Sequence, residues 1–473
     1  MRTKLVFALV LALFVAGPGC RKSGGPEGIW QGTLKVPTGE LRVVFHINKA
    51  ADGKLSATMD SPDQGANGIA IDTVAYSNGK LSMKANAIKG SFDGTMKTDG
   101  RTIDGKWKQG PFSLALVLTR VDKVVEANRP QEPKKPYPYK EEEVEFPNPV
   151  AGIKLAGTLT MPDSGGPFGA VALITGSGPE DRNEAVFGHK PFLVLADYLT
   201  RRGIAVLRWD DRGVGKSTGD PKTATTADLA TDVLAAVAYL KTRAEIAPNR
   251  IGLLGHSEGG VIAPMVANQS KDIAFVVLMA GTGLRGDSIL MLQSRLVAKA
   301  EGASDSTIAA TMPFERRTLD IALKETDTAV AAPELRAVMK EALAKMSAQD
   351  KEAFGYSDEA IEPQVKQVLS PWFRYFLRYD PQPALRALKV PVLAVVGSKD
   401  VQVAPKENLS AIEAALKAGG NKDYTVKELP GLNHLLQTAV TGGISEYAKT
   451  EETIAPAALA VMGDWIVAHA AAR

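Results

Sequence analysis

The most informative part of this sequence is RIGLLGHSEGG, which spans residues 250–260. It begins with an apolar run typical of a buried strand and ends in the pattern Gly-x-Ser-x-Gly around Ser257. A serine on a sharp strand-to-helix turn needs small neighbours, and Gly255 and Gly259 supply them. The backbone N–H groups that begin the following helix can stabilise a developing negative charge. The stretch therefore predicts a nucleophile at Ser257.

Strands and helices alternate on both sides of this stretch. The expected strands are 169–175, 204–209, 250–254, 273–279, 390–396 and 424–429, and two expected helices are 192–202 and 227–242. Apolar strands of this length, separated by helices, are typical of a parallel sheet that is covered on both faces. We therefore expect an α/β fold over residues 142–473.

The strands stop between about 284 and 379, where Ala, Glu, Lys, Leu and Met predominate. Helices are expected there, for example at 333–346 and 359–369. Such an insertion between two strands is most simply a cap over the C-terminal edge of the sheet. The alternative is a helical domain with no part in the site.

A serine hydroxyl needs a base, and in folds of this kind an acid and then a histidine follow the nucleophile in the chain. The five histidines are His46, His189, His256, His434 and His469. His256 is not the candidate base, because it is adjacent to Ser257 on the turn and the side chains of adjacent residues there should point in different directions. Only His434 follows the last expected strand in a loop, so it is the candidate base.

The candidate acid is Asp400, which follows the expected strand at 390–396. An aspartate there can hold the imidazole of His434 in the correct tautomer and stabilise its protonated form. The alternative is an aspartate that only caps a turn or helix. Asp380, which precedes a proline, suits that role better.

Two backbone N–H groups are expected to bind the developing oxyanion. One is that of Glu258, and the other is that of Ser177 in the glycine-rich loop 175–183. A simple glycine turn is the alternative for that loop. The segment 210–217, after the next strand, is expected to be a structural turn braced by Asp–Arg pairing.

Residues 26–122 have a different character. Short β-prone segments are separated by turn signals such as Asp52-Gly53 and Asn78-Gly79, which predicts a small antiparallel β-barrel or sandwich. Residues 123–141 are rich in proline and charge, so we expect a stiff, extended linker between two domains.

The first twenty residues have the features of an export signal. Arg2 and Lys4 precede an apolar run at 5–16, which is too short to span a bilayer. Cys20 is the only cysteine, and with Gly19 before it the position resembles the acylated cysteine of bacterial lipoproteins. We expect an exported, lipid-anchored protein; the alternative is a cysteine with no role.

Composition excludes several classes of function. A net charge of +3 gives no reason to expect a nucleic-acid partner. Neither a cysteine cluster nor a His-x-x-x-His pattern is present, so no metal and no cofactor is expected. Membrane contact is expected only through Cys20, and the oligomeric state stays open.

The chain resembles the bacterial α/β-hydrolase group related to serine aminopeptidases and exported esterases. The resemblance rests on the loop GSGPEDR at 176–182, on PWFRYF at 371–376, and on the β module followed by a linker. Glu180 stands where that group usually has a glutamine. The resemblance implies an α/β-hydrolase fold and carboxylesterase activity on small acyl esters.

Other functions stay open. A thioesterase could use the same residues, whereas a peptidase would need a peptide-binding module or a paired-glutamate clamp in the cap, and neither is evident. A surface-binding lipoprotein with an inert hydrolase domain is the non-enzyme alternative. Flexible apolar side chains of the cap are suited to bind a short acyl chain, although ordinary packing in the helical core is the favoured interpretation for each of them singly. They are Met291, Leu292, Leu296, Met312, Met339 and Met346.

Overall fold

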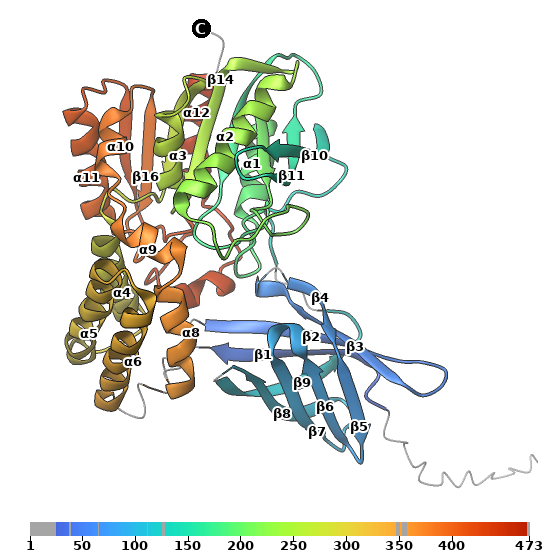
Figure 1. Ribbon diagram of the computed structural model, residues 1–473. Helices are drawn as coiled ribbons and strands as arrows, with labels where there is room; N and C mark the ends of the chain where they lie inside the picture. Colours follow the sequence, from blue (N-terminus) through green and yellow to red (C-terminus); the bar gives the residue numbers. More distant parts are fainter. Residues whose placement is uncertain are drawn as a thin grey trace, which may run out of the picture.

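The computed structural model describes residues 25–36, 39–64, 66–110, 112–124, 128–346, 351 and 357–470 (Figure 1). The predicted export signal and Cys20 lie outside these residues. Within the described part of the chain, no helix is long and apolar enough to cross a membrane.

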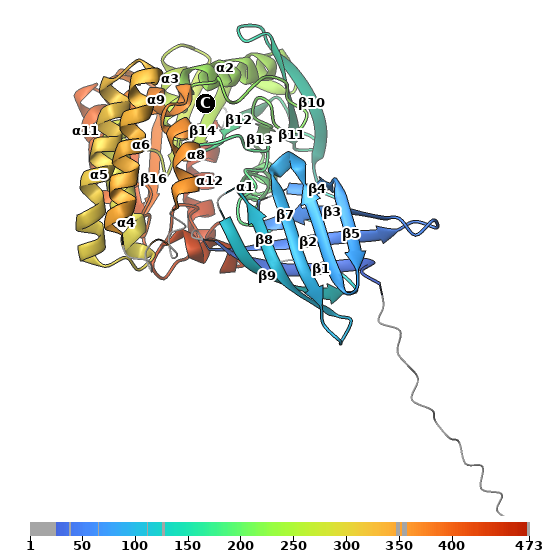
Figure 2. The ribbon, with the colours of Figure 1, turned by 60° about the horizontal axis from the view of Figure 1, so that its bottom comes forward.

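The N-terminal part forms, among the described residues, a nine-stranded antiparallel sheet (Figure 2). The strands are β1 (Gly28–Val36), β2 (Gly39–Lys49), β3 (Leu55–Ser61), β4 (Ala66–Ile71), β5 (Thr73–Ser77), β6 (Lys80–Ala85), β7 (Gly90–Met96), β8 (Thr102–Gln109) and β9 (Phe112–Val121). The sheet order is β4-β3-β2-β1-β9-β8-β7-β6-β5.

This sheet curls into a nearly closed barrel, because β3 contacts β5 and β4 contacts β6 across the open edge. Alternate residues point inward, and the large side chains of Trp30, Phe45, Phe92 and Trp107 fill the interior. The small antiparallel β-barrel predicted from turn spacing is confirmed, and its interior is a packed core.

The second sheet has eight strands among the described residues, in the order β10-β11-β13-β12-β14-β15-β16-β17. The strands are β10 (Lys140–Asn148), β11 (Ile153–Met161), β12 (Phe168–Ile174), β13 (Ala205–Trp209), β14 (Ile246–His256), β15 (Ile273–Met279), β16 (Val392–Gly397) and β17 (Tyr424–Leu429). The pairs from β13 to β17 are parallel, and β10 and β11 pair antiparallel at one edge.

Helices cover both faces of this sheet, as expected for a parallel sheet with apolar strands. One face packs against α2 (Thr226–Thr242), α3 (Gly259–Ala267), α10 (Gln382–Ala387) and α11 (Pro405–Ala418), and the other against α1 (Pro191–Thr200) and α12 (Pro456–Ala470). The predicted α/β-hydrolase architecture is confirmed.

The two edge strands β10 and β11 were not expected. The sheet begins at Lys140, two residues before the expected start at 142, and the run of charge at Glu141, Glu142 and Glu143 hides the alternation of an edge strand. These glutamates are directed to the surface while Val144 and Phe146 pack into the core.

The helical insertion lies between β15 and β16. Its helices are α4 (Gly286–Ala300), α5 (Asp305–Lys324), α6 (Thr328–Lys345), α8 (Asp358–Val368) and α9 (Pro371–Arg378). They share a small core of their own, and in Figure 1 they lie below the eight-stranded sheet. The expected helix start at 333 is wrong: Asp327 caps α6 by accepting from the Ala329 N–H, and Pro333 lies inside the helix.

Candidate active site

Ser257 lies on the turn between β14 and α3, at the C-terminal edge of the parallel sheet. Its φ angle is +52°, a conformation that non-glycine residues rarely adopt, and its N–H donates to Met279 O. A Cβ at Gly255 would clash with Gly259 O, and a Cβ at Gly259 would clash with Ile174 O. The strained turn expected from the glycine pattern is therefore present.

Asp400 and His434 form a buried hydrogen-bonded pair at the same edge of the sheet. Asp400 follows β16, His434 follows β17, and His434 Nδ1 lies 2.8 Å from Asp400 Oδ2. The other oxygen, Asp400 Oδ1, accepts from the N–H groups of Gln402 and Val403 at 2.8 Å each. The carboxylate is thus fixed, and it can hold the imidazole in the tautomer whose Nε2 accepts a proton.

Ser257 and His434 line one cavity of about 400 Å³ between the sheet and the cap. Ser177 and Glu258 line it as well, and Asp400 lies behind His434. The structure therefore brings all five predicted site residues together. The cap contributes part of the wall through α4 and α9, with Ile289, Leu290, Gln293, Trp372 and Phe376.

The two expected oxyanion donors lie on the loop after β12 and at the start of α3. In the described part of the chain, neither the Ser177 N–H nor the Glu258 N–H donates a hydrogen bond to another protein group. The Glu258 carboxylate is buried, accepts from Thr226 Oγ1 and Trp372 Nε1, and its pKa is raised by burial. The cap is thus bonded directly to the residue after Ser257.

The cap side chains expected to hold an acyl chain do not line the cavity. Met291 and Met339 pack inside the cap core, while Ile289 and Leu290 face the cavity. Core packing, the interpretation favoured for each side chain singly, is thus confirmed for Met291 and Met339. The suggested role in holding an acyl chain is wrong, because helical spacing identifies an apolar face but not the neighbour that covers it.

His256 is placed differently from the sequence expectation. Its ring does not diverge from the site but packs 4.9 Å from the ring of His434, centroid to centroid. His256 Nδ1 lies 2.8 Å from Glu184 Oε1, and Nε2 lies 3.1 Å from His434 O. Both partners are acceptors, which indicates that both ring nitrogens carry hydrogen.

The charge on His256 depends on Glu184. Burial alone would lower the pKa of His256, but the carboxylate of Glu184 outweighs burial and raises it. Glu184 Oε1 also accepts from the Gly176 N–H at 2.9 Å, so the carboxylate links the loop of Ser177 to His256, and the His256 ring in turn reaches His434 O. Sequence reasoning missed this pair, because only the fold brings the two residues together.

Arg129 of the linker contacts two segments that border the active-site cavity. Its guanidinium donates to Asn128 O in the linker and to four backbone carbonyls of the α/β domain: Phe187 at 3.1 Å, Gly188 at 3.0 Å, Ala448 at 3.1 Å and Thr450 at 2.9 Å. The expected stiff spacer is therefore docked onto the α/β domain. The proline and charge content of the linker did not predict this docking, because the carbonyl groups that Arg129 binds there are distant in sequence.

The segments held by Arg129 carry two residues of the cavity wall. The rings of Phe187 and Tyr447 meet edge to face, with centroids 5.6 Å apart. His189, two residues after Phe187, is fully buried between Thr453 Oγ1 and Tyr447 O. Burial, with the nearby charge of Arg129, lowers the pKa of His189 to about 4, so it is a neutral core histidine.

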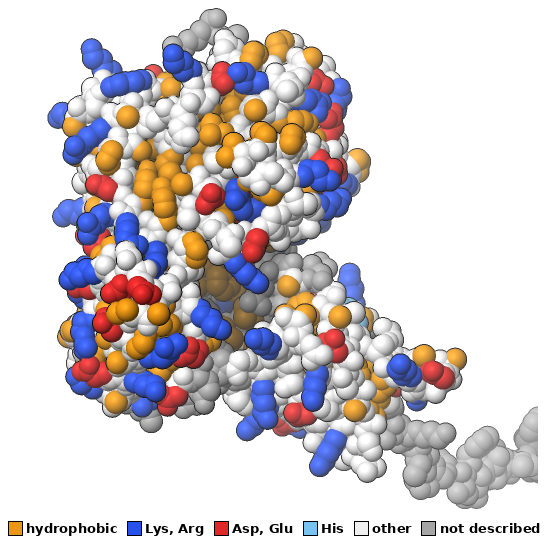
Figure 3. Space-filling model, in the orientation of Figure 1, with side chains coloured by type: hydrophobic (Ala, Val, Ile, Leu, Met, Phe, Trp, Pro, Cys, Tyr) orange, Lys and Arg blue, Asp and Glu red, His pale blue; other side chains and the backbone are white. Residues whose placement is uncertain are grey.

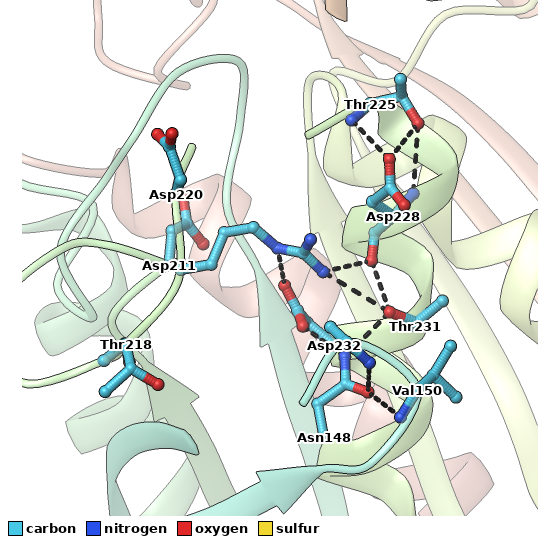
Figure 4. Close-up of polar contacts among 12 residues, drawn as sticks. Asn148, Val150, Asp211, Thr218, Asp220, Thr225, Asp228, Thr231 and Asp232 are labelled. Atoms are coloured by element: carbon cyan, nitrogen blue, oxygen red, sulfur yellow. Dashed lines mark hydrogen bonds and ion pairs between the residues drawn. The ribbon is translucent and has the colours of Figure 1, made fainter. Parts of the chain in front are cut away.

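The turn at 210–217 is braced by ion pairs, but not within itself. Arg212 pairs with Asp232 of α2 at 2.8 Å, and Asn148 donates to the same carboxylate group (Figure 4). Asp210 pairs with Arg182 of the oxyanion loop at 2.8 Å. Asp211 is buried, and burial raises its pKa to about 8.

The described residues contain no group of three or more His, Cys, Asp or Glu side chains that could hold a metal ion. On the face shown in Figure 3, acidic and basic side chains are interspersed. Neither observation points to a metal centre or to a polyanion-binding surface.

A sequence model described as the alpha/beta hydrolase family matches residues 173–440, more than half of the chain. The chain belongs to the alpha/beta hydrolase family. The match begins in β12, before the oxyanion loop, and ends after His434, so it includes all five predicted site residues.

Relatives within the alpha/beta hydrolases include esterase EstD of Thermotoga maritima. The chain is 33% identical to EstD over 177 residues, which are 37% of this chain and 42% of EstD. It is 32% identical to thiohydrolase aneE of Aspergillus aculeatus over 136 residues, 28% of this chain and 40% of that one. The chain thus spans less than half of the length of either relative.

Among solved structures, the Pyrococcus furiosus esterase Pf2001 matches with 15% sequence identity and a TM-score of 0.43. The match covers 74% of this chain and all of that one.

Proposed function

We propose that this protein is a carboxylesterase that cleaves short-chain acyl esters through an acyl-enzyme at Ser257. The observation that carries the proposal is the buried Asp400–His434 hydrogen bond beside a strained serine, in a cavity lined by two available backbone donors. The name of EstD agrees with ester hydrolysis.

In the proposed mechanism, His434 Nε2 takes the proton of Ser257 as Oγ attacks the ester carbonyl. The N–H groups of Ser177 and Glu258 stabilise the negative oxygen of the tetrahedral intermediate. His434 then gives its proton to the leaving alcohol, and the C–O bond breaks to leave the acyl-enzyme. Water, deprotonated by the same histidine, attacks the acyl group and releases the acid.

The dimensions of the cavity support a short acyl chain. A volume of about 400 Å³ is near the lower end of ligand pockets. Its apolar wall is short, because Phe187, Tyr447, Trp372 and Phe376 enclose it with rigid rings. Long chains would have to leave the cavity or displace these rings.

We expect p-nitrophenyl acetate and butyrate to be hydrolysed with the highest kcat/KM and the dodecanoate at least about tenfold more slowly, because the outer methylenes lack a pocket. Initial rates across the chain-length series test this. A kcat/KM that rises steadily to the dodecanoate would contradict the short-chain assignment.

Amide and thioester analogues belong in the same series. We expect negligible activity on aminoacyl p-nitroanilides, since amide cleavage requires a substrate held at several points. Efficient anilide cleavage, with esters as poorer substrates, would favour a peptidase. The similarity to a thiohydrolase makes the thioester the second candidate, and S-phenyl thiobutyrate beside phenyl butyrate distinguishes the two.

We further propose that the protein is exported and anchored through an acylated Cys20. The charged start, the apolar run at 5–16 and the small residue Gly19 support this. Metabolic labelling with an alkyne palmitate should tag wild type but not Cys20→Ala, which should leave the membrane fraction. An unlabelled and freely soluble wild type would overturn the anchor.

A further inference from the structure

Two carboxylates in the cavity have unpaired oxygens. Glu180 and Glu184 both line the cavity that contains Ser257. Among the described residues, neither Glu180 Oε2 nor Glu184 Oε2 has a hydrogen-bond partner, although both atoms are buried. The Glu184 side chain is only 2% exposed. Buried acceptors without a partner are rare and costly, and each one calls for an explanation.

Glu184 lies beside the nucleophile, and Glu180 lines the same cavity. A Cβ built on Gly176 would lie 3.5 Å from Ser257 Cβ and 3.6 Å from Glu184 Oε1, so the serine and the glutamate meet at this glycine. Glu184 also has a positive φ of 53°, and such strain in a non-glycine residue is typical of functional sites. Its other oxygen, Oε1, is already occupied by Gly176 and His256.

Protonated His256 pairs with Glu184 Oε1, but the cavity lining holds no second cation for Glu180. The lining contains three glutamates and two histidines, and no lysine or arginine. The nearest loop arginine, Arg182, is directed away to Asp210 and Glu143. Burial, together with the charge of Glu184, raises the pKa of Glu180. A cation placed beside Glu180 would offset the cost of ionising it.

We propose that Glu180 and Glu184 form a subsite for a primary ammonium group on the ester substrate. The proposal rests on the proposed esterase function and names its substrate class. A primary ammonium carries three donors and can reach two separate carboxylate oxygens at once.

The test compares two esters that differ only by exchange of a terminal methyl for an ammonium group, ethyl pentanoate and ethyl 4-aminobutanoate. Glu180→Gln keeps the shape of the side chain, and the Glu180 backbone N–H can still donate to Asp211. In this variant we expect kcat/KM for the ammonium ester to fall about tenfold or more, and that for the neutral ester to stay within about twofold.

The matched control is Glu315→Gln. Glu315 is a largely buried cap glutamate that accepts from Ser294, does not line the cavity, and has a pKa raised by burial. We expect Glu315→Gln to change kcat/KM for neither ester. The ammonium subsite is wrong if Glu180→Gln leaves the ratio of kcat/KM for the two esters unchanged. It is also wrong if Glu315→Gln shifts that ratio by the same factor.

Binding to Ser257→Ala separates this proposal from the esterase proposal. Calorimetry should detect butylammonium but not 1-butanol, and the added Glu180→Gln change should abolish the difference. Wild type that hydrolyses no ester refutes the esterase, whereas this binding difference still decides the subsite. Equal binding of the amine and the alcohol refutes the subsite whatever the activity.

Discussion

Replacement of Ser257 by alanine should lower kcat on p-nitrophenyl acetate by about 10⁴-fold or more, and His434→Ala should have an effect of similar size. Both residues act in the same step, since the hydroxyl is a poor nucleophile unless the imidazole takes its proton. Ser257→Ala should also lose covalent labelling by a fluorophosphonate probe, which requires no knowledge of the natural substrate.

The control for this prediction is His469→Ala, because His469 lies on α12 and stacks on Trp465 away from the cavity. Circular dichroism and thermal melting should show that all variants are folded. If His434→Ala retained more than about a tenth of wild-type activity, the assignment of the base would be wrong. If the wild-type serine took up no probe, the non-enzyme alternative would be favoured.

Asp400→Asn should lower kcat by about 10⁴-fold without unfolding the protein. The asparagine carbonyl can still accept from the N–H groups of Gln402 and Val403, so the turn should keep its geometry. Its amide nitrogen would instead face His434 Nδ1 and favour the tautomer whose Nε2 carries hydrogen. That tautomer cannot take the serine proton.

The matched variant is Asp380→Asn, since the Asp380 carboxylate also accepts a hydrogen bond from a backbone N–H two residues later, that of Gln382. We expect full activity from it. Steady-state kcat and the melting temperature are the two measurements. An active Asp400→Asn enzyme would show that the acid does not set the tautomer, and a Tm that falls with the activity would make the loss structural.

The residues that sequence reasoning located are those set by local pattern. Ser257 has glycines two residues before and after it, and Asp400 and His434 follow strands that are continuous apolar runs. A short stretch of chain contains the whole physical reason for each of these positions. The same holds for β15 and β17, whose bounds agree with the expected ranges.

What the sequence could not predict depends on contacts between distant segments. Glu184 and His256 are paired only because β12 and β14 are neighbours in the sheet. Nothing in the sequence indicates that one oxygen of Glu180 is unpaired. Its burial and its lack of a hydrogen-bond partner depend on how the loop packs in the folded protein. In the edge strand β10, the charged residues obscure the alternating pattern by which its buried residues could have been recognised in the sequence.

The docking of Arg129 has a consequence for how the protein can be divided. Four main-chain carbonyls in the two segments that carry Phe187 and Tyr447 accept hydrogen bonds from a side chain upstream of the first strand of the α/β sheet. A catalytic fragment cut at Lys140 would lose those donors and let the segments of Phe187 and Tyr447 relax. The linker is thus a structural part of the catalytic domain. Any transplant of this catalytic core must carry Arg129 with it or supply a substitute brace.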